Sequence, residues 1–405
     1  MRGPTQCPDR SGPRKDGGEP ISRRGRRQDR RATERRLRER EHWSGRSGVS
    51  AGGLMESSEE NLDTSERVRV AFFGVGSVAT AALKVCRQRP WMEVVAAVRR
   101  PSSAAGRTTA GPWTGGRVWT DPEAMLEETR PDVALIATRS ELDSVLPLIR
   151  LCARKGVHVI STSEELAWPD VEQPGAGASL HRAAQQAGVV IAATGTNPGF
   201  AFDALPLVLA GAAWDVSRII VQRTLDASVF GRDVHRSLGI GYTEPEFRGA
   251  VRSRRVRGHI GFAESARVIA AGMGLEIERF DEEIEPVLAD RVHVLAGYTI
   301  EPPETAGVVQ LATAWVGRRE WLRFELSLHV APDEVGWETR DRIRIYGENE
   351  LDLTMEPGMP AVATTAALLV NAVPAVLAAR PGFYPPALLL PTTPWLAPRR
   401  PPGRA

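Results

Sequence analysis

Short apolar runs alternate with helix-length stretches along the first half of the chain, beginning at Val68. Apolar runs of roughly four to eight residues are typical of buried strands, and longer periodic stretches indicate helices. The predicted strands are 68–73, 93–98, 132–137, 157–161 and 189–193, and the predicted helices are 78–88, 142–155 and 177–187. This alternation predicts a doubly wound α/β domain with a parallel sheet.

A different pattern begins after about Thr194, where polar residues regularly interrupt longer apolar runs. From Trp321 to Leu328 charged and apolar residues alternate, which is typical of a strand with one buried and one solvated face. The strands expected here are 219–224, 276–287, 308–316, 321–329 and 341–348, with a helix at 262–272 and a last apolar helix at 362–379. The second half therefore predicts an α+β domain with a mainly antiparallel sheet.

The two ends of the chain lack these patterns. Residues 1–64 are rich in Arg, Gly, Ser and Glu without apolar periodicity, so we predict a disordered leader there. The 405 residues then suit two domains with tails. We expect the α/β domain at 65–200, the α+β domain at 201–360, a C-terminal helix that packs back at 361–383, and a proline-rich tail at 384–405.

Charge is distributed unevenly between the leader and the rest of the chain. Residues 1–50 hold fifteen Lys and Arg against seven Asp and Glu, a net charge of +8. Because the whole chain has a net charge of +2, residues 51–405 have a net charge of −6. The leader's arginines could neutralise nucleic-acid phosphates. We favour the alternatives of a solvated tail, or of sequence upstream of a start at Met55, and expect no nucleic-acid partner.

Cysteine and lysine are scarce. Cys7, Cys86 and Cys152 are scattered without nearby histidines, so we expect no disulfide framework, no metal site and a reducing, cytoplasmic location. No lysine follows Lys155, which excludes a Schiff-base lysine from the second half of the chain. Because no uninterrupted apolar run approaches the ~18 residues of a membrane span, we expect no membrane partner.

A glycine turn joins the first predicted strand to the first predicted helix and indicates a cofactor class. Gly74 permits the tight turn, Gly76 lets the backbone approach a pyrophosphate, and Ala79 keeps the helix close to the sheet. The phosphates would then lie on free N–H groups at the helix N-terminus, which includes Ser77 and Val78. Because the motif lies between a strand and a helix, we predict a Rossmann domain that binds NAD or NADP.

The residues after the second strand indicate which of the two cofactors binds. In NAD enzymes an acidic residue about 20 positions after the glycine turn accepts the ribose 2′-OH. Here that spacing ends on Arg99, followed by Arg100. A guanidinium can bind a 2′-phosphate in a charge-assisted pair, so we predict a preference for NADP. The alternative is that both arginines only solvate a loop.

Three polar loops follow the later strands of the α/β domain. Ligands of open parallel sheets bind outside the carboxyl ends of the strands, so these loops should converge on one crevice. The cofactor-contacting candidates among them are Thr138, Arg139, Ser161, Thr162, Asn197 and Pro198.

A family resemblance becomes specific at two of these loops. The segments Ser161-Thr162-Ser163-Glu164-Glu165 and Gly195-Thr196-Asn197-Pro198-Gly199-Phe200 resemble hallmarks of the 2,4-diaminopentanoate dehydrogenase family. That family belongs to the dihydrodipicolinate-reductase-like Rossmann enzymes and includes native amine dehydrogenases. The resemblance runs from about Val68 to Phe383. It implies NAD(P)-dependent oxidative deamination of a small amine or diamino acid through an imine, by a homodimer whose second domain binds substrate and forms the dimer.

Amine oxidation needs a group that takes the substrate's proton, stabilises the iminium and activates water, and a carboxylate can do all three. Glu164 and Glu165 lie where such a group is expected, and we prefer Glu164 as the catalytic residue, with Glu165 capping or pairing. The alternative is that both glutamates cap the following helix. His259, between two glycines, is a weaker candidate for orienting substrate or relaying a proton.

A substrate carboxylate would also need an anchor. Four arginines of the second domain are available for it, and the sequence does not choose among them: Arg232, Arg236, Arg252 and Arg254. Two other functions stay open at this stage. One is a reductase of another imine or carbonyl compound, and the other is a non-catalytic NADP-binding regulatory protein.

Overall fold

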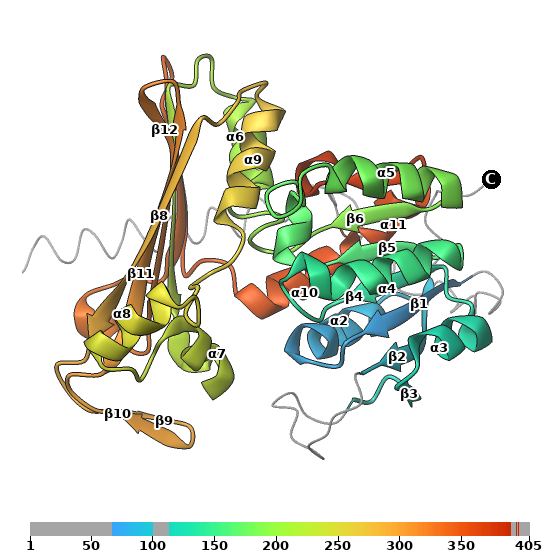
Figure 1. Ribbon diagram of the computed structural model, residues 1–405, viewed down its shortest axis with the longest axis horizontal. Coiled ribbons are helices and arrows are strands. Elements are labelled where there is room, and N and C mark those ends of the chain that lie inside the picture. The colour runs from blue at the N-terminus through green and yellow to red at the C-terminus, as the bar shows by residue number, and fades with distance from the viewer. Residues whose placement is uncertain (1–66, 100–112, 390–393, 395, 397–405) are drawn as a thin grey trace, which may run out of the picture. The chain divides into compact units, whose positions relative to one another are not determined.

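The computed structural model describes residues 67–99, 113–389, 394 and 396. All of them belong to one compact unit, 61–405. The predictions for the leader at 1–64, for Arg100 and for most of the tail at 384–405 fall on residues outside the described ranges. The structure confirms the predicted fold class, because a parallel α/β domain precedes a domain with a mainly antiparallel sheet (Figure 1).

The first domain is built on a seven-stranded sheet in which every pair of neighbouring strands is parallel. In spatial order its strands are β15 (Gly382–Tyr384), β6 (Val190–Ala193), β5 (His158–Ser161), β4 (Val133–Ile136), β1 (Val68–Phe73), β2 (Met92–Val98) and β3 (Val118–Trp119). The order reverses between β1 and β4, which is where a doubly wound sheet opens its ligand crevice.

Helices cover both faces of this sheet. One face packs against α3 (Pro122–Thr129), α4 (Leu142–Arg154) and α5 (Ala176–Ala187). The other packs against α2 (Ser77–Arg87), α10 (Ala361–Asn371) and α11 (Val373–Ala378). Because alternate strand residues point to opposite faces, strands buried on both sides are apolar throughout, as the sequence pattern indicated.

The predicted single helix at 362–379 is wrong in one respect, since the structure has two helices there, α10 and α11. Pro374 in the first turn of α11 has no N–H to continue the helical hydrogen bonds of α10. The stretch Ala361–Ala378 is long and apolar enough to cross a membrane by length and composition. Its residues Leu369, Val370 and Val373 are fully buried against α2 and the sheet, which is the packing of a core helix.

The second domain contains a six-stranded sheet in which β7 and β12 are parallel and the other pairs antiparallel. Its order is β14 (Leu351–Met355), β13 (Arg340–Tyr346), β7 (Arg218–Asp226), β12 (Arg319–His329), β11 (Thr305–Val316) and β8 (Arg279–Leu288). A two-stranded ribbon, β9 (His293–Leu295) with β10 (Tyr298–Ile300), accompanies it.

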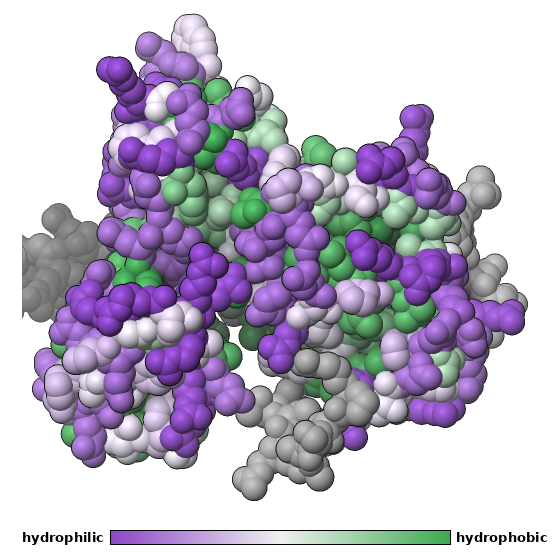
Figure 2. Space-filling model, viewed as in Figure 1, coloured by the Kyte–Doolittle hydropathy of each residue, from purple (hydrophilic) through white to green (hydrophobic). Residues whose placement is uncertain are grey.

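One face of this sheet forms a core with short helices, while charged side chains pair on the other face, for example Arg342 with Asp352. The helices are α6 (Ala204–Ala210), α7 (Arg232–Leu238), α8 (Glu244–Arg252) and α9 (Phe262–Gly272). The surface over α7 and α8 is mainly hydrophilic (Figure 2). Of these helices the sequence pattern predicted α9 alone, because the other three are too short to show a period.

Candidate active site

The glycine turn between β1 and α2 has the geometry that a dinucleotide requires. Gly74 has φ +105°, and a Cβ there would lie 2.2 Å from the carbonyl oxygen of Ala137, at the end of β4. A Cβ at Gly76 would meet nothing within 4 Å, so space is open in front of α2. Ala79 is fully buried and brings α2 close to the sheet.

Backbone N–H groups at the start of α2 are free to bind an anion. In the described residues no side chain caps this helix, so the first-turn N–H groups, including those of Ser77 and Val78, keep their hydrogen-bonding capacity. Such groups, together with the helix dipole, bind phosphate. The open space and the uncapped helix therefore fit the pyrophosphate of NAD(P).

The predicted ribose-recognition position lies beside this turn. Arg99 directly follows β2, the neighbour of β1, and its backbone N–H bonds to the carbonyl of Trp119. Arg99 is thus at the expected edge of the sheet, with an exposed side chain.

A cavity of about 530 Å³ joins the two domains at this edge of the sheet. From the first domain it is lined by residues of the α2 turn and of the loops after β4, β5 and β6: Val78, Ser140, Glu141, Glu164, Thr196 and Asn197. From the second domain it is lined by residues that include Leu225, Phe230, Arg254, Gly258 and His259. The three polar loops that the sequence singled out therefore meet in one cavity.

Several residues predicted to contact the cofactor are not among the described residues that line this cavity. Ser161 is buried, and its hydroxyl accepts a hydrogen bond from the Ser163 N–H, 3.1 Å away. Pro198 is buried against Gly261. Thr162 is half-buried, whereas Thr138 and Arg139 are exposed beyond β4. Ser161 and Pro198 thus shape the loops, and the sequence could not distinguish them from residues that face the cavity.

The two adjacent glutamates have different surroundings. Glu165 is buried, and its Oε2 accepts a hydrogen bond of 2.7 Å from the N–H of Leu142, the first residue of α4. Its Oε1 pairs with Arg257 at 3.0 Å. Glu164 faces the cavity, and burial raises the pKa of its carboxyl to about 7. Neighbouring Glu141 adds to that shift, while the Ser140 hydroxyl opposes it.

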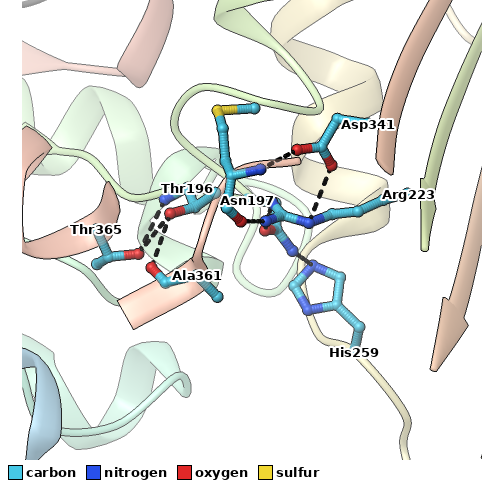
Figure 3. A network of polar contacts seen from close by, with 8 residues as sticks. Thr196, Asn197, Arg223, His259, Asp341, Ala361 and Thr365 are labelled. Atoms are coloured by element: carbon cyan, nitrogen blue, oxygen red, sulfur yellow. Dashed lines mark hydrogen bonds and ion pairs between the residues drawn. The ribbon is translucent and has the colours of Figure 1, made fainter. Parts of the chain in front are cut away.

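His259 belongs to a polar network that reaches deep into the second sheet (Figure 3). Asn197 Oδ1 accepts a 2.8 Å hydrogen bond from Arg223, so its Nδ2 is the atom that faces His259 Nε2, at 2.9 Å. Because an amide nitrogen can only donate, Nε2 accepts and any ring proton sits on Nδ1. Burial, with the Arg223 charge, lowers the pKa of His259 to about 3. The ring is therefore neutral near pH 7, with Nε2 as the acceptor of the Asn197 hydrogen bond.

Arg223 and Asp341 form the buried end of the network, on neighbouring strands β7 and β13. Arg223 Nε lies 3.2 Å from Asp341 Oδ1, and Asp341 Oδ2 accepts a 2.6 Å hydrogen bond from the Met359 N–H. Arg223 also donates to the Met359 carbonyl. Sequence reasoning missed both residues. The available signal was an arginine inside the apolar strand 219–224, where a buried charge needs a partner.

Gln310 of β11 fixes the backbone that carries His259. It accepts a 2.7 Å hydrogen bond from the His259 N–H and donates one of 2.9 Å to the His259 carbonyl. A Cβ at Gly258 would lie 2.3 Å from the Gln310 side chain. The glycine beside His259 thus permits this close approach.

The loop after β6 is tied to α10 by threonine hydroxyls. Thr196 Oγ1 lies 2.8 Å from Thr365 Oγ1 and donates to the Ala361 carbonyl, 3.0 Å away (Figure 3). Since Thr196, Thr365 and Ala361 all line the cavity, the C-terminal helix is part of the site.

Of the four arginines proposed as carboxylate anchors, Arg254 lines the cavity. Arg255 and Arg257 line it as well, although Arg257 is paired with Glu165. Arg232 stacks over the ring of Tyr298, 5.2 Å from its centroid. The cavity that Glu164 lines therefore also has basic residues in its lining.

Comparison with known proteins matches the two halves of the chain to two family models. The model of the 2,4-diaminopentanoate dehydrogenase C-terminal domain matches residues 200–392, and that of the oxidoreductase family with an NAD-binding Rossmann fold matches residues 68–191. The 2,4-diaminopentanoate dehydrogenase of Acetoanaerobium sticklandii is 27% identical over 325 residues, which are 79% of this chain and 92% of that protein.

A solved structure shows the same fold. The amine dehydrogenase from Mycobacterium smegmatis matches with a TM-score of 0.71 and 24% identity, covering 82% of this chain and 98% of that one. These matches confirm the resemblance stated from the loops after β5 and β6. The chain thus combines an NAD-binding oxidoreductase half with a half that matches the 2,4-diaminopentanoate dehydrogenase C-terminal domain, and it is an NAD(P)-dependent dehydrogenase similar to that enzyme.

Proposed function

We propose that the protein catalyses the reversible oxidative deamination of a small amine or diamino acid, with Glu164 as the acid–base residue. The observation that carries the proposal is the position of Glu164. Its carboxyl, with a pKa raised to about 7, faces the cavity into which the uncapped start of α2 also opens. General acid–base groups act best when their pKa is close to the working pH.

The nicotinamide of NAD(P)+, when bound, accepts the hydride from the amine carbon. Ionised Glu164 first takes a proton from the ammonium form of the substrate, so that the amine is neutral when hydride leaves. Glu164 then releases this proton to solvent, and the regenerated carboxylate lies beside the positive iminium and stabilises it. Finally, Glu164 accepts a proton from the water that attacks the imine carbon, and ammonia leaves as the carbonyl forms.

Other side chains of the cavity hold the reactants. The neutral His259 ring and the Asn197 amide are fixed by Arg223 and Gln310, so they offer rigid hydrogen-bonding atoms to the substrate. Arg254, whose guanidinium has no side-chain partner in the described part of the chain, supplies a cation at the rim. A carboxylate-bearing amine, such as a diamino acid, has the charge that this cation recognises.

The remaining parts of the proposal concern cofactor, assembly and location. The position of Arg99 supports NADP over NAD, because a guanidinium there pairs with a 2′-phosphate. The family resemblance supports a homodimer formed through the second domain, and a cytoplasmic enzyme.

A substrate panel tests the proposal. Small amines and diamino acids are offered with NAD+ and NADP+, and ketones and keto acids are offered with NADH or NADPH, with and without ammonium chloride. We expect NADPH oxidation that depends on ammonium, together with an equal amount of primary amine detected by mass spectrometry. Oxidation of NADPH by a ketone without ammonium would instead identify the alternative reductase and refute amine dehydrogenation.

A further inference from the structure

A second, smaller cavity of about 120 Å³ lies next to the proposed active site. The two cavities share Arg257, His259 and Ile260 in their linings, so this short segment forms part of the wall of both. Three carboxylates line the smaller one: Glu172, Glu264 and Glu282. We call it the acidic cavity.

Glu264 is the unusual member of this group. It lies in the first turn of α9 and is 3% exposed, and its carboxyl accepts a hydrogen bond from its own backbone N–H. Among the described residues no cation pairs with it, and a buried carboxylate without a cationic partner is strongly unfavourable. Burial, helped by the charges of Glu165, Glu172 and Glu282, raises the pKa of this carboxyl to about 8. The acidic cavity therefore contains a buried acceptor that lacks a cationic donor.

The charges around the cavity define that donor. The one cation in the described lining, Arg257, is already paired with Glu165. Glu172 and Glu282 are exposed, so the carboxylates extend from solvent to the buried Glu264. A cation entering there would meet carboxylate oxygens throughout.

We propose that the acidic cavity binds the ammonium ion, or a small primary alkylammonium ion, through Glu264. This inference rests on the proposed function, in which ammonia is the product of deamination and the substrate of the reverse reaction. A cavity of 120 Å³ holds only a small ion, since one water occupies about 30 Å³ of the liquid. Ammonium has N–H donors, with which it can form charge-assisted hydrogen bonds to the Glu264 carboxylate.

The site is distinct from the acid–base residue but adjacent to it. A Cβ placed at Gly261, which lines the acidic cavity, would lie 3.3 Å from the Cβ of Glu164, which lines the larger one. The elements that carry Glu164 and Glu264 are therefore packed together. An ion on Glu264 would raise the local concentration of ammonium beside the active site without touching the carbonyl substrate.

A binding experiment tests this independently of turnover. The thermal unfolding midpoint of the full chain is measured in ammonium chloride and in tetramethylammonium chloride at equal ionic strength, near pH 8.5. Tetramethylammonium has the charge but no N–H to donate. We expect ammonium to raise the midpoint above the tetramethylammonium value, since a ligand that binds only the folded state stabilises it. Glu264→Gln should abolish the difference.

The matched control is Glu283→Gln, because Glu283 is exposed on β8 beside Glu282 and lies outside the described lining of the acidic cavity. This control should respond to ammonium like the unmodified protein. If Glu264→Gln does not fold, Glu282→Gln removes the second carboxylate and should weaken the response. Equal stabilisation by the two salts, or an unchanged response in the folded Glu264→Gln protein, would overturn the proposal.

Steady-state kinetics separate this inference from the proposed function. In reductive amination Glu264→Gln should raise the KM for ammonium about tenfold, which corresponds to about one hydrogen bond to a charged group, with kcat and the carbonyl KM unchanged within about twofold. If the unmodified protein turns over no carbonyl compound with ammonium, the proposed function is wrong. The unfolding experiment then still shows whether ammonium binds at Glu264. If Glu264→Gln turns over substrate with an unchanged KM for ammonium, the ammonium site is wrong and the proposed function is unaffected.

Discussion

The two domains contribute to the cavity by different physical means. Besides the Glu164 side chain, the first domain offers backbone groups: a turn in which no side chain fits at Gly74, and the free N–H groups of α2. The second domain holds side chains in place with its own buried side chains: Arg223 holds Asn197 of the neighbouring loop, and Gln310 holds the backbone of His259 (Figure 3). A backbone site depends on local conformation, whereas a side-chain site depends on which strands pair. Substitutions in the two domains should therefore fail in different ways.

The largest effect is expected at the glycine turn. Gly74→Ala places a Cβ 2.2 Å from the Ala137 carbonyl at φ +105°, so it should lower the free energy of unfolding by about 3–5 kcal/mol, from backbone strain and overpacking together. Urea unfolding measures it.

Gly76→Ala is the matched control, because its Cβ meets nothing within 4 Å. It should leave stability within about 0.5 kcal/mol yet weaken cofactor binding at least about tenfold, as the methyl group occupies the space proposed for the pyrophosphate. Equal stability losses in the two variants would contradict the assignment of Gly74 to folding and Gly76 to binding.

The next effect is expected in the buried pair of the second domain. Asp341→Asn leaves the buried Arg223 guanidinium without a counter-charge and should destabilise the protein by about 3 kcal/mol. Asp352→Asn, which removes a partly exposed pair with Arg342 on the same sheet, should cost about 1 kcal/mol or less. The two unfolding curves decide this, and similar losses would argue that Arg223 is not supported by Asp341.

Glu165→Gln should have a smaller effect on stability. It removes the ion pair with Arg257 and weakens the hydrogen bond to the Leu142 N–H, for an expected loss of about 1–2 kcal/mol. Glu128→Gln, which breaks an exposed pair with Arg117, is the control and should change stability little. A Glu165→Gln protein as stable as the control would refute the capping role.

The smallest effect concerns cofactor choice. Arg99→Ser should weaken NADP binding about tenfold, because it removes one charge-assisted contact, and should leave NAD binding unchanged. Fluorescence titration with both cofactors measures it, with Arg150→Ser, exposed on α4, as the control. A parallel loss for NAD and NADP would remove the argument for NADP.

The difference between local conformation and contacts of distant segments also explains how much of the structure the sequence could predict. The strand at 68–73, the helix at 262–272 and the function of Gly74 depend on short-range patterns, and the structure has both elements at the predicted bounds. That Glu164 and not Glu165 faces the cavity depends on α4 and on Arg257, 92 residues beyond Glu165. The Arg223–Asp341 pair depends on β7 lying beside β13. Such contacts between distant segments leave no local pattern to recognise.

The most direct test of the account is the pH dependence of amine oxidation in Glu164→Gln and Glu165→Gln. Glu164 must be ionised to accept the substrate's proton, and its pKa is raised to about 7, so kcat should rise with pH and level off above about 7 in the unmodified enzyme. Glu164→Gln should lower kcat by about 10²–10⁴-fold and lose this inflection, while a folded Glu165→Gln enzyme should keep it. Full turnover with an unchanged profile in Glu164→Gln would contradict the central claim.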